Sequence, residues 1–462
     1  MDDLLRLAER YSVRAPRYTS YPTAADFHNG IGFRDLAQAI ERSNTDPQPA
    51  PLSLYLHLPF CHSLCFYCAC NRVITRNTQR ASEYRKLIPA EAQLLAPLIA
   101  DNREVEQIHL GGGTPTYFRP QELREMLEAL GSVLRFAPPS RSNWSIEIDP
   151  RTVSPDDIFS LHEIGFSRLS FGVQDLDPEV QQAINRQHAP EALESLVAAT
   201  RSVGFDSLNF DLIYGLPHQN AERFERTLTH VIDLDPDRIA LYGYAHLPTR
   251  FRAQRLLETE ALPRGAARIA LLVQAIERLT EAGYEYIGMD HFARPGDGLS
   301  RSRQAQTLVR NFQGYMPGPH GDLLGLGASA IGSLGGAYIQ NTHTARDWQT
   351  AVQAGRHPAE RGYILNRDDR IRRDVIGAIM CRDSVPFPEF ESRHAIRFTH
   401  YFGDALRRLE PLERDGLVRC GNDRLDILPR GRLFLRAIAM LFDAHLAAAA
   451  HTVTTPRYSQ VV

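Results

Sequence analysis

The stretch Leu52-Ser-Leu-Tyr-Leu-His-Leu-Pro-Phe-Cys-His-Ser-Leu-Cys-Phe-Tyr-Cys-Ala-Cys70 joins a strand-like pattern to a group of cysteines. Apolar residues alternate with polar or aromatic ones over residues 52–58, which predicts a β-strand. This strand leads directly into four of the six cysteines of the chain, Cys61, Cys65, Cys68 and Cys70. The sequence therefore predicts a strand that ends at a thiol-rich site.

Similar strand patterns follow at regular intervals along the chain, at residues 107–110, 145–148, 168–173, 208–213 and 238–242, with amphipathic helical patterns between them. A helix start is legible at Ser154-Pro-Asp-Asp157, and glycines at 165, 204 and 283 are typical helix ends. Strands that alternate with helices form parallel sheets with right-handed crossovers. We expect an α/β fold with about six such units, an incomplete (β/α)6 TIM-like barrel.

The pattern changes after residue 310. Residues 311–322 are rich in glycine and proline and predict a loop, and residues 323–331 fit either a close-packed backbone beside a ligand or a tight turn. From residue 368 the chain is helical with a small hairpin, which resembles a winged helix. We therefore divide the chain into an N-terminal segment (1–50), a partial barrel (51–310), a connecting segment (311–367) and a helical C-terminal domain (368–462).

Composition excludes several functional classes. With 43% hydrophobic and 23% charged residues, the chain of 462 residues is typical of a globular protein, and it contains no apolar run of membrane-spanning length. Acids at positions 2 and 3 argue against a secretory signal, so we expect a cytoplasmic protein. A net charge of −3, with arginines interspersed among acids in the C-terminal domain, argues against a nucleic-acid partner.

Clustered cysteines in a reducing compartment indicate metal or redox chemistry rather than disulfides. No second Cys or His pair at zinc-finger spacing follows, so an iron–sulfur cluster fits better than zinc. Three thiolates on a 4Fe–4S cluster would leave one iron open for a small molecule. The spacing leaves Cys70 as an alternative fourth ligand, although one intervening residue after Cys68 is a cramped separation.

Polar residues and glycines recur where the predicted strands end. In a parallel barrel these ends meet on one face, where ligands bind. The candidates are Gly111-Gly-Gly-Thr-Pro-Thr116, Glu147 and Asp149, Gly172 and Gln174, Asp211, and Tyr244-Ala-His246. Each has a structural alternative, since glycines form turns and acids cap helices. Their convergence beside the cysteine loop favours a common cavity.

The cysteine spacing, with Tyr67 before Cys68, resembles that of the radical S-adenosylmethionine enzymes. Four further features resemble the family of oxygen-independent coproporphyrinogen III oxidases (coproporphyrinogen dehydrogenases). They are Pro16-Arg-Tyr-Thr-Ser-Tyr-Pro-Thr23, Cys70, Gly288-Met-Asp-His-Phe-Ala293 and Asn311-Phe-Gln-Gly-Tyr315. The resemblance extends from about residue 11 to the C-terminus.

The resemblance implies a 4Fe–4S cluster held by Cys61, Cys65 and Cys68, with Cys70 outside the coordination sphere, and two molecules of S-adenosylmethionine. The molecule on the open iron would contact Tyr55, Gly112, Glu147 and Ile331. The second would contact Tyr67, Gly113, Thr114, Gln174, Arg186, Asp211 and Ala245, with Gln313 nearby. It also implies that the N-terminal segment covers the barrel mouth. No residue is assigned a catalytic role.

The implied activity is oxidative decarboxylation of two propionates of coproporphyrinogen III to vinyl groups, which gives protoporphyrinogen IX in haem biosynthesis. Hydrogen on an unactivated propionate carbon is not acidic, so a cofactor radical must remove it, and the resemblance implies a 5′-deoxyadenosyl radical. The implied partners are the substrate, an unidentified reductant and an electron acceptor, with neither membrane nor nucleic acid, and the chain would act as a monomer. Arg17 is the candidate basic partner of the anionic substrate.

Two alternative functions share the cysteine loop. One is a related radical enzyme that acts on haem, and the other is a non-catalytic haem chaperone. Relatives of the chaperone class usually lack both Cys70 and the Pro16–Thr23 segment, so these features favour the oxidase.

Overall fold

The computed structural model describes residues 2–11, 13–318, 321–449 and 458 of the chain. Within them the chain forms two compact units, each built from separate stretches of sequence. The sheet unit contains residues 28–263 and 321–364, and the helical unit contains residues 2–27, 264–318 and the chain from 365 onward. The predicted division was linear along the chain. In the structure the first 50 residues are shared between the two units instead.

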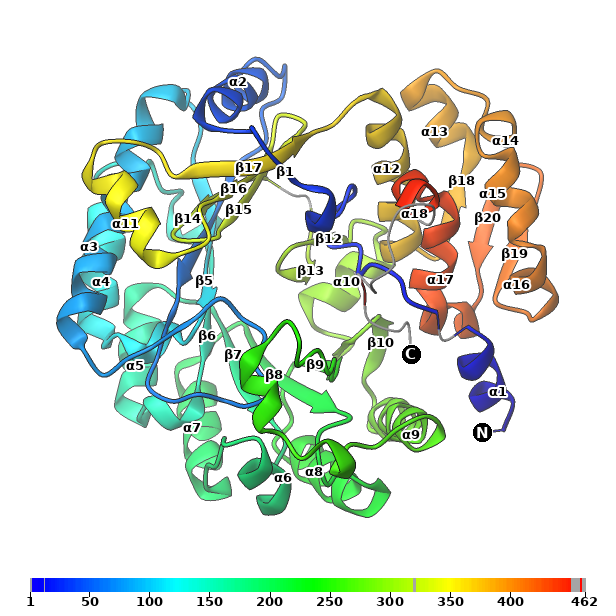
Figure 1. The fold of residues 1–462 in the computed structure, drawn as a ribbon, viewed down its shortest axis with the longest axis horizontal. Helices are drawn as coiled ribbons and strands as arrows, with labels where there is room; N and C mark the ends of the chain where they lie inside the picture. Colours follow the sequence, from blue (N-terminus) through cyan, green and yellow to red (C-terminus); the bar gives the residue numbers. More distant parts are fainter. Residues whose placement is uncertain (1, 12, 319–320, 450–457, 459–462) are drawn as a thin grey trace. The chain divides into compact units, whose positions relative to one another are not determined.

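Six parallel strands form the centre of the sheet unit, as predicted (Figure 1). They follow one another in the order β2 (Leu52–Leu58), β5 (Val105–Gly112), β6 (Asn143–Ile148), β7 (Arg168–Gln174), β8 (Ser207–Tyr214) and β9 (Arg238–Gly243). Almost every side chain of β2 is buried, because both faces of a parallel sheet are covered. The predicted α/β architecture is confirmed.

The helices between these strands lie on the outer side of the sheet (Figure 1). They are α3 (Thr78–Leu95), α4 (Pro120–Gly131), α5 (Pro155–Ile164), α6 (Pro178–Ala183), α7 (Pro190–Val203) and α8 (Ala221–Asp233). Ser154 caps α5 by accepting a hydrogen bond from the backbone N–H of Asp157 at 3.3 Å. Gly165 then ends α5 at φ 112°, and Gly204 ends α7 at φ 80°. Local sequence therefore fixes these helix boundaries.

A second group of strands extends the sheet beyond β2. Strand β14 (Asp322–Leu326) pairs with β2 in parallel, and β15 (Ile331–Leu334), β16 (Ala337–Asn341), β17 (Ala359–Ile364) and β1 (His28–Asn29) follow as antiparallel neighbours. Helices α2 (Phe33–Asn44) and α11 (Ala345–Gln353) belong to the same part. Residues 323–331 are thus a strand and a turn: a Cβ on Gly325 would lie 2.8 Å from the backbone of Ile331. Close backbone packing and a turn are both present here, and a ligand beside this segment stays a prediction.

The helical unit has its own apolar core. It contains α1 (Asp2–Arg10), α9 (Ala266–Glu281), α10 (Gly298–Gln304), α12 (Arg367–Cys381), α13 (Phe387–His394), α14 (Phe398–Tyr401), α15 (Gly403–Arg408), α16 (Glu410–Arg414), α17 (Leu435–Ala439) and α18 (Ala444–Ala449). Strands β18 (Ser384–Pro386), β20 (Arg424–Ile427) and β19 (Val418–Cys420) form a small sheet among these helices. Phe387 stacks on Phe398 in this core, with ring centroids 4.2 Å apart. The predicted helical domain with a small hairpin is confirmed.

The remaining strands of the helical unit form two hairpins. They are β10 (Glu285–Gly288) with β11 (His291–Ala293) and β12 (Val309–Asn311) with β13 (Gly314–Met316). Residues 311–322 were predicted to be loop, but Asn311 and Gly314–Met316 are paired strand residues of this second hairpin, whose turn is formed by residues 312 and 313. The loop prediction was wrong there because a three-residue strand is too short to show a period.

The segment Pro16–Thr23 packs within the helical unit. Arg436 donates a hydrogen bond to the carbonyl of Pro16 at 3.0 Å, and the Tyr18 hydroxyl donates one to Asp443 at 2.9 Å. Arg17 forms an ion pair with Asp290. Its guanidinium charge is therefore shared with a carboxylate of the same unit, and its predicted role toward substrate stays a prediction.

No helix in the described part of the chain is both long enough and apolar enough to cross a membrane.

Candidate functional site

The cysteine loop begins where β2 ends and is fixed by its backbone. The short strand β3 (Phe60–Cys61) pairs in parallel with β4 (Val73–Ile74), which follows the loop. Asn185 donates a side-chain hydrogen bond to the carbonyl of Leu64 at 2.7 Å, and the N–H of Phe66 bonds the carbonyl of Ile184 at 3.0 Å. These bonds attach the loop to the segment after α6.

Each of the three predicted ligand sulfurs accepts a hydrogen bond. The Thr114 hydroxyl donates to Cys61 Sγ at 3.4 Å, and the N–H of Cys70 donates to Cys68 Sγ at 3.4 Å. Cys65 Sγ accepts from two guanidinium groups, Arg186 Nη1 at 3.5 Å and Arg151 Nη2 at 3.6 Å. All six cysteines are free thiols. Hydrogen bonds to thiolate sulfur tune an iron–sulfur cluster, so this donor set fits one.

The thiols differ in acidity. Burial raises the pKa of Cys61 to about 11, whereas hydrogen bonding with Cys70 and the charge of Arg72, partly offset by burial, lower the pKa of Cys68 to about 6. The same contact with Cys68, followed by burial, raises the pKa of Cys70. The contact between the two residues therefore favours the thiolate form of Cys68 and the protonated form of Cys70.

No three His, Cys, Asp or Glu side chains converge on one metal-ion position within the described residues. The ligands of a 4Fe–4S cluster bind different iron atoms, so its thiolates do not meet at one point. The surroundings of the sulfurs are therefore the relevant test of fit.

Each of the three glycines at the end of β5, Gly111, Gly112 and Gly113, lies too close to other protein atoms for a side chain to fit. A Cβ on Gly111 would lie 2.9 Å from Glu147 Oε1, one on Gly112 would lie 2.6 Å from the His57 ring, and one on Gly113 would lie 2.5 Å from the Pro59 carbonyl carbon. The Gly112 N–H bonds Glu147 Oε2 at 3.3 Å, and the Gly113 N–H bonds the carbonyl of Leu58 at 2.9 Å. These two N–H groups bond the protein itself, and the predicted cofactor contacts of Gly112 and Gly113 stay predictions.

An alanine at position 113 should therefore displace the cysteine loop. The new methyl group would press on the backbone between β2 and Cys61, and we expect a loss of about 1 to 3 kcal/mol in stability together with lower iron content. Thermal unfolding and iron analysis of Gly113→Ala measure both. The control is Gly377→Ala in α12, where a Cβ meets nothing within 4 Å. Equal iron loading in Gly113→Ala and wild type would contradict this expectation.

Glu147 and Tyr55 both contact His109. Glu147 Oε1 is 3.3 Å from His109 Nε2, and the Tyr55 ring stacks on His109 with centroids 5.9 Å apart. The Tyr55 hydroxyl also lies 3.1 Å from His57 Nδ1, and burial lowers the pKa of His57. Both histidines were missed from the sequence, although they occupy strand positions that follow the alternating pattern.

Asp211 lies partly buried on β8 beside further polar groups. Asn209 and Ser170 donate hydrogen bonds to its carboxylate at 2.9 and 3.1 Å. Burial, followed by the charge of Glu147, raises the pKa of Asp211 to about 7. A carboxyl group with a pKa near 7 is partly protonated at neutral pH, so burying it under a ligand costs little. It can still accept hydrogen bonds from a polar ligand.

Arg186 is one of the predicted contacts of the second S-adenosylmethionine, and it also contacts a cysteine of the loop. Its Nη1 forms an ion pair with Asp149 at 3.0 Å, and its Nη2 donates to the carbonyl of Gly172 at 2.7 Å. Asp149 also binds Arg151 Nη2 at 2.7 Å. Gln174 follows in the left-handed region at φ 68°. Asp149 thus holds two guanidinium groups against Cys65.

Arg151 should tune the cluster. Replacement by glutamine removes a positive charge and one donor to Cys65 Sγ, so the cluster becomes harder to reduce. We expect the reduction equilibrium constant of Arg151→Gln to fall about tenfold, which is about 59 mV for one electron. An EPR-monitored redox titration measures this, with Arg151→Lys as the charge-preserving control. An unchanged midpoint would contradict the assignment.

Tyr67 and Ala245 are brought together by a residue that sequence reasoning missed. Gln254 Nε2 donates to the carbonyls of Tyr67 and Ala245 at 3.0 and 3.1 Å. Tyr67 also packs against an apolar cluster that contains Val180, Ile184 and Tyr244. The signal was hidden because Gln254 lies in a short 3-10 helix after β9 with no motif of its own.

The two remaining predicted cofactor contacts, Ile331 and Gln313, lie far along the chain from the residues described above. Ile331 begins β15, and the turn before it is held by buried Glu91 of α3, whose Oε2 accepts from the N–H of Gly327 at 2.7 Å. Trp348 Nε1 donates to the same oxygen at 2.9 Å, and Asn341 Nδ2 donates to Oε1 at 2.5 Å. Burial raises the pKa of Glu91 to about 7. Gln313 belongs to the helical unit, and its contact with a cofactor stays a prediction.

The parallel sheet and its cysteine loop define a radical S-adenosylmethionine enzyme. Residues 55–231 match the model of the Radical SAM superfamily, and residues 365–434 match that of the HemN C-terminal domain. The chain belongs to the family of oxygen-independent coproporphyrinogen III oxidases, because relatives of that name match it over its full length. The Pseudomonas aeruginosa protein is 43% identical across 100% of this chain and 98% of its own. The Escherichia coli protein is 42% identical across 96% and 95%.

A solved structure supports the same assignment. The coproporphyrinogen III oxidase of Escherichia coli, described as a radical SAM enzyme, superposes with a TM-score of 0.89 at 41% identity, covering 93% of this chain and 97% of that one. The cofactors of the class are a 4Fe–4S cluster and S-adenosylmethionine.

Proposed function

We propose that this chain decarboxylates two propionates of coproporphyrinogen III to vinyl groups without oxygen, giving protoporphyrinogen IX. The observation that carries the proposal is a full-length match at 43% identity to a coproporphyrinogen III oxidase, together with a cysteine loop whose three predicted ligand sulfurs each accept hydrogen bonds. The two alternative functions are a radical enzyme that acts on haem and a chaperone that only carries haem. No contact described above favours either of them.

Cys61, Cys65 and Cys68 would hold the cluster, and Cys70 would remain outside it. When bound, the cluster and S-adenosylmethionine supply a 5′-deoxyadenosyl radical that takes a hydrogen atom from the propionate β-carbon. Loss of carbon dioxide and one electron then completes the vinyl group, and the electron passes to an acceptor. The chemistry of the C–H bond therefore belongs to the cofactor, and the protein supplies binding and orientation.

The predicted cofactor contacts fall into two groups, one for each S-adenosylmethionine. Tyr55, Gly112, Glu147 and Ile331 would contact the first S-adenosylmethionine. A second molecule would lie against Tyr67, Gly113, Thr114, Gln174, Arg186, Asp211 and Ala245, with Gln313 nearby. The carboxylates at 147 and 211 suit the ammonium and hydroxyl groups of such a ligand, since both groups donate hydrogen bonds.

The chain would act as a monomer in the cytoplasm, where thiols stay reduced before cluster assembly. An anaerobic assay tests the function: coproporphyrinogen III, S-adenosylmethionine and dithionite are supplied to the cluster-loaded protein. We expect two vinyl groups and two molecules of carbon dioxide per porphyrinogen. If a fully loaded protein forms neither product, the proposal is rejected. Opening of added haem would favour the rival enzyme.

A further inference from the structure

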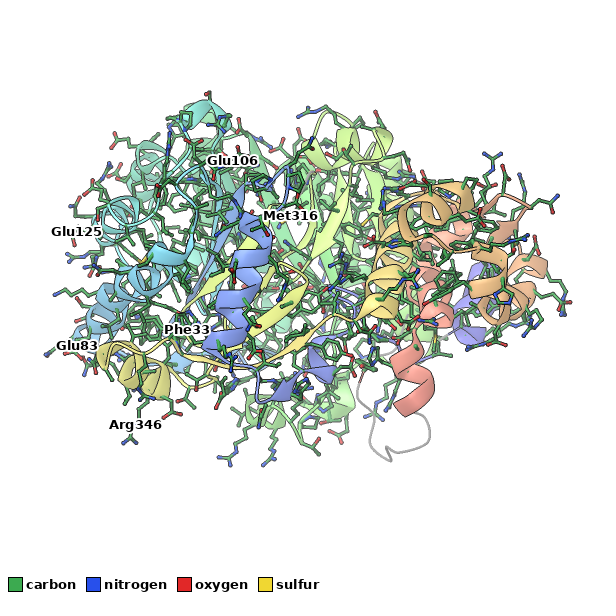
Figure 2. The ribbon with its side chains drawn as sticks, turned by 90° about the horizontal axis from the view of Figure 1, so that it is seen from above. Phe33, Glu83, Glu106, Glu125, Met316 and Arg346 are labelled. Carbon is green, nitrogen blue, oxygen red and sulfur yellow. The ribbon has the colours of Figure 1, made fainter. Side chains whose placement is uncertain are left out.

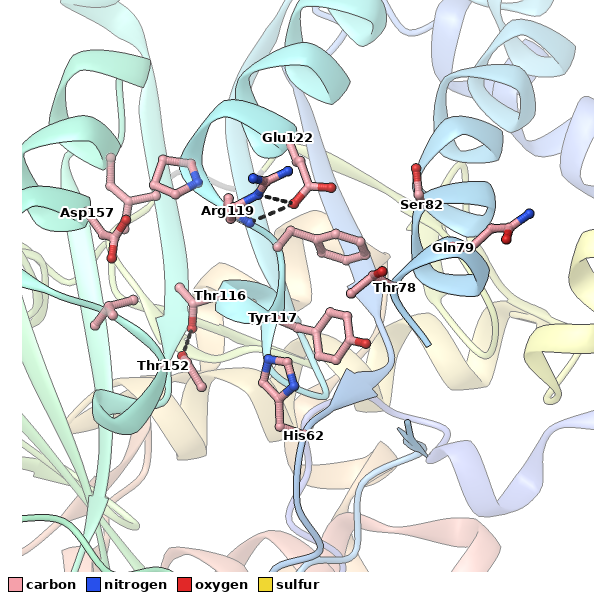
Figure 3. A pocket seen from close by; sticks show the side chains of 14 residues that line it. His62, Thr78, Gln79, Ser82, Thr116, Tyr117, Arg119, Glu122, Thr152 and Asp157 are labelled. Carbon is pink, nitrogen blue, oxygen red and sulfur yellow. Dashed lines mark hydrogen bonds and ion pairs between the residues drawn. The ribbon is translucent and has the colours of Figure 1, made fainter. Parts of the chain in front are cut away.

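The groove beside the cysteine loop has its charges engaged within the protein (Figure 3). Its volume is about 670 Å³, and Arg119, Glu122 and Asp157 carry the formal charges among the residues that line it. Arg119 pairs with Glu122 at 3.4 Å, and Ser154 donates hydrogen bonds to Asp157. Because the arginine of this groove is already paired, the groove does not select an anionic ligand. An arginine whose charge is not matched lies in the helical unit.

This arginine is Arg310 of β12, which lies opposite Tyr315 of β13 in the register of the hairpin. Its guanidinium carbon is 4.6 Å from the centroid of the Tyr315 ring, and its Nε donates a hydrogen bond to the carbonyl of Arg17 at 3.2 Å. Tyr315 is itself fixed, because its ring is buried and its hydroxyl donates to the carbonyl of Met380 at 2.7 Å. One face and one edge of the Arg310 guanidinium are therefore held in place.

The two terminal nitrogens of Arg310 have no acceptor in the described part of the chain. Nη1 is buried without a hydrogen bond, and neither nitrogen forms an ion pair with a described Asp or Glu. The Tyr315 ring attracts the cation but does not neutralise its charge. A partly buried guanidinium without a counter-ion costs free energy, so its presence here calls for a ligand that supplies the missing charge.

Two other arginines of the helical unit have carboxylate partners. Arg17, whose carbonyl accepts the hydrogen bond from Arg310, forms an ion pair with Asp290. Arg432 forms an ion pair with Asp383. The sequence pointed to Arg17 as the basic partner of an anionic substrate, but the side chain of Arg17 already has a counter-ion. The unmatched charge belongs to Arg310, which contacts the same N-terminal segment.

A carboxylate is the anion that best fits the free end of this side chain. A guanidinium presents its N–H groups as a planar fork, and it binds a carboxylate through two parallel hydrogen bonds. The substrate of the proposed reaction carries propionates that react and propionates that are retained. An ion pair with a reacting carboxylate would stabilise its charge and oppose the loss of carbon dioxide. A fixed arginine therefore suits a propionate that is retained.

We propose that Arg310 binds a retained propionate of coproporphyrinogen III and so holds the substrate while another propionate reacts. This inference rests on the proposed function and adds a substrate contact within the helical unit. Arg310 directly precedes the run Asn311-Phe-Gln-Gly-Tyr315, yet the sequence gave no reason to single it out. No bond is made or broken at Arg310, because its role is to bind and orient the substrate.

The test measures binding and turnover separately in Arg310→Gln. The binding probe is coproporphyrin III, an oxidised porphyrin with the same propionates as the substrate, and quenching of its fluorescence follows binding to the cluster-loaded protein. We expect its Kd to rise about tenfold or more, since a charge-assisted pair is lost. The KM for coproporphyrinogen III should rise with it, while kcat, iron content and the Kd of S-adenosylmethionine stay close to wild type. Arg310→Lys, which keeps the charge but not the fork, should have an intermediate Kd.

Arg294→Gln is the matched control. Arg294 also lies over a tyrosine ring of the helical unit, 3.9 Å from the centroid of Tyr284, and it donates to the carbonyl of Ala282 at 2.6 Å. We expect this control to lower the thermal midpoint of unfolding and to keep the wild-type Kd for coproporphyrin III. Arg310→Gln should lose affinity without a larger loss of stability than the control, because an unmatched cation does not stabilise the fold.

A wild-type Kd for coproporphyrin III in Arg310→Gln, or an equal loss of affinity in Arg294→Gln, would overturn the propionate contact. Failure of the proposed function gives a different result. In that case the cluster-loaded wild type forms no vinyl product from coproporphyrinogen III, whatever the affinity of the two variants for the probe.

Discussion

Cys65→Ala is expected to bind no 4Fe–4S cluster and to form no vinyl product. Cys65 is buried and accepts hydrogen bonds from Arg186 and Arg151, so its loss removes a ligand and leaves two guanidinium groups facing a void. A cluster with two remaining thiolates is not retained through purification. Iron and sulfide analysis, the visible charge-transfer absorption and the anaerobic product assay measure the effect.

Cys70→Ala is the control for that result. The substitution keeps the hydrogen bond from the backbone N–H at position 70 to Cys68 Sγ and removes the side-chain hydrogen bond between the two thiols. We expect wild-type iron and sulfide content in this variant. Loss of the cluster from Cys70→Ala would show that four cysteines bind it, and an intact cluster in Cys65→Ala would remove Cys65 from the ligand set.

Glu91→Ala is expected to destabilise the sheet unit most. The carboxylate is fully buried and accepts hydrogen bonds from Gly327, Asn341 and Trp348. Alanine leaves three buried donors without a partner, which costs at least about 3 kcal/mol. We expect the thermal midpoint of unfolding to fall by about 5 °C or more.

Glu83→Ala on the same helix is the matched control, because Glu83 is exposed at the surface (Figure 2). Its midpoint should stay within about 1 °C of wild type, since exposed substitutions rarely exceed about 0.5 kcal/mol. If the two variants unfold at the same temperature, the buried network contributes little and the turn before Ile331 is held by other contacts.

The parts of the fold that follow from local chemistry could be predicted. The six parallel strands show clear apolar runs, and the helix ends at Gly165 and Gly204 follow from the positive φ that glycine permits. The positions of Glu147 and Asp211 beside the cysteine loop follow from the rule that strand ends meet on one face.

The missed features depend on contacts that are distant in sequence. Arg151 contacts Cys65 Sγ, and Gln254 joins Tyr67 to Ala245, yet neither Arg151 nor Gln254 belongs to a recognisable motif. The sequence left the three glycines open between a turn and a ligand site, and only the structure shows that their lack of side chains permits close packing against Glu147, His57 and Pro59. Only the folded chain shows which partner a backbone N–H uses.

The central claim is that one iron of the cluster is left unligated by the protein so that S-adenosylmethionine binds it. The most direct measurement is ENDOR spectroscopy of the reduced, cluster-loaded protein with S-adenosylmethionine carrying ¹⁵N in its amino group. We predict a ¹⁵N hyperfine coupling to the cluster that is absent without the labelled cofactor. A cluster that shows no such coupling at saturating S-adenosylmethionine would contradict the account.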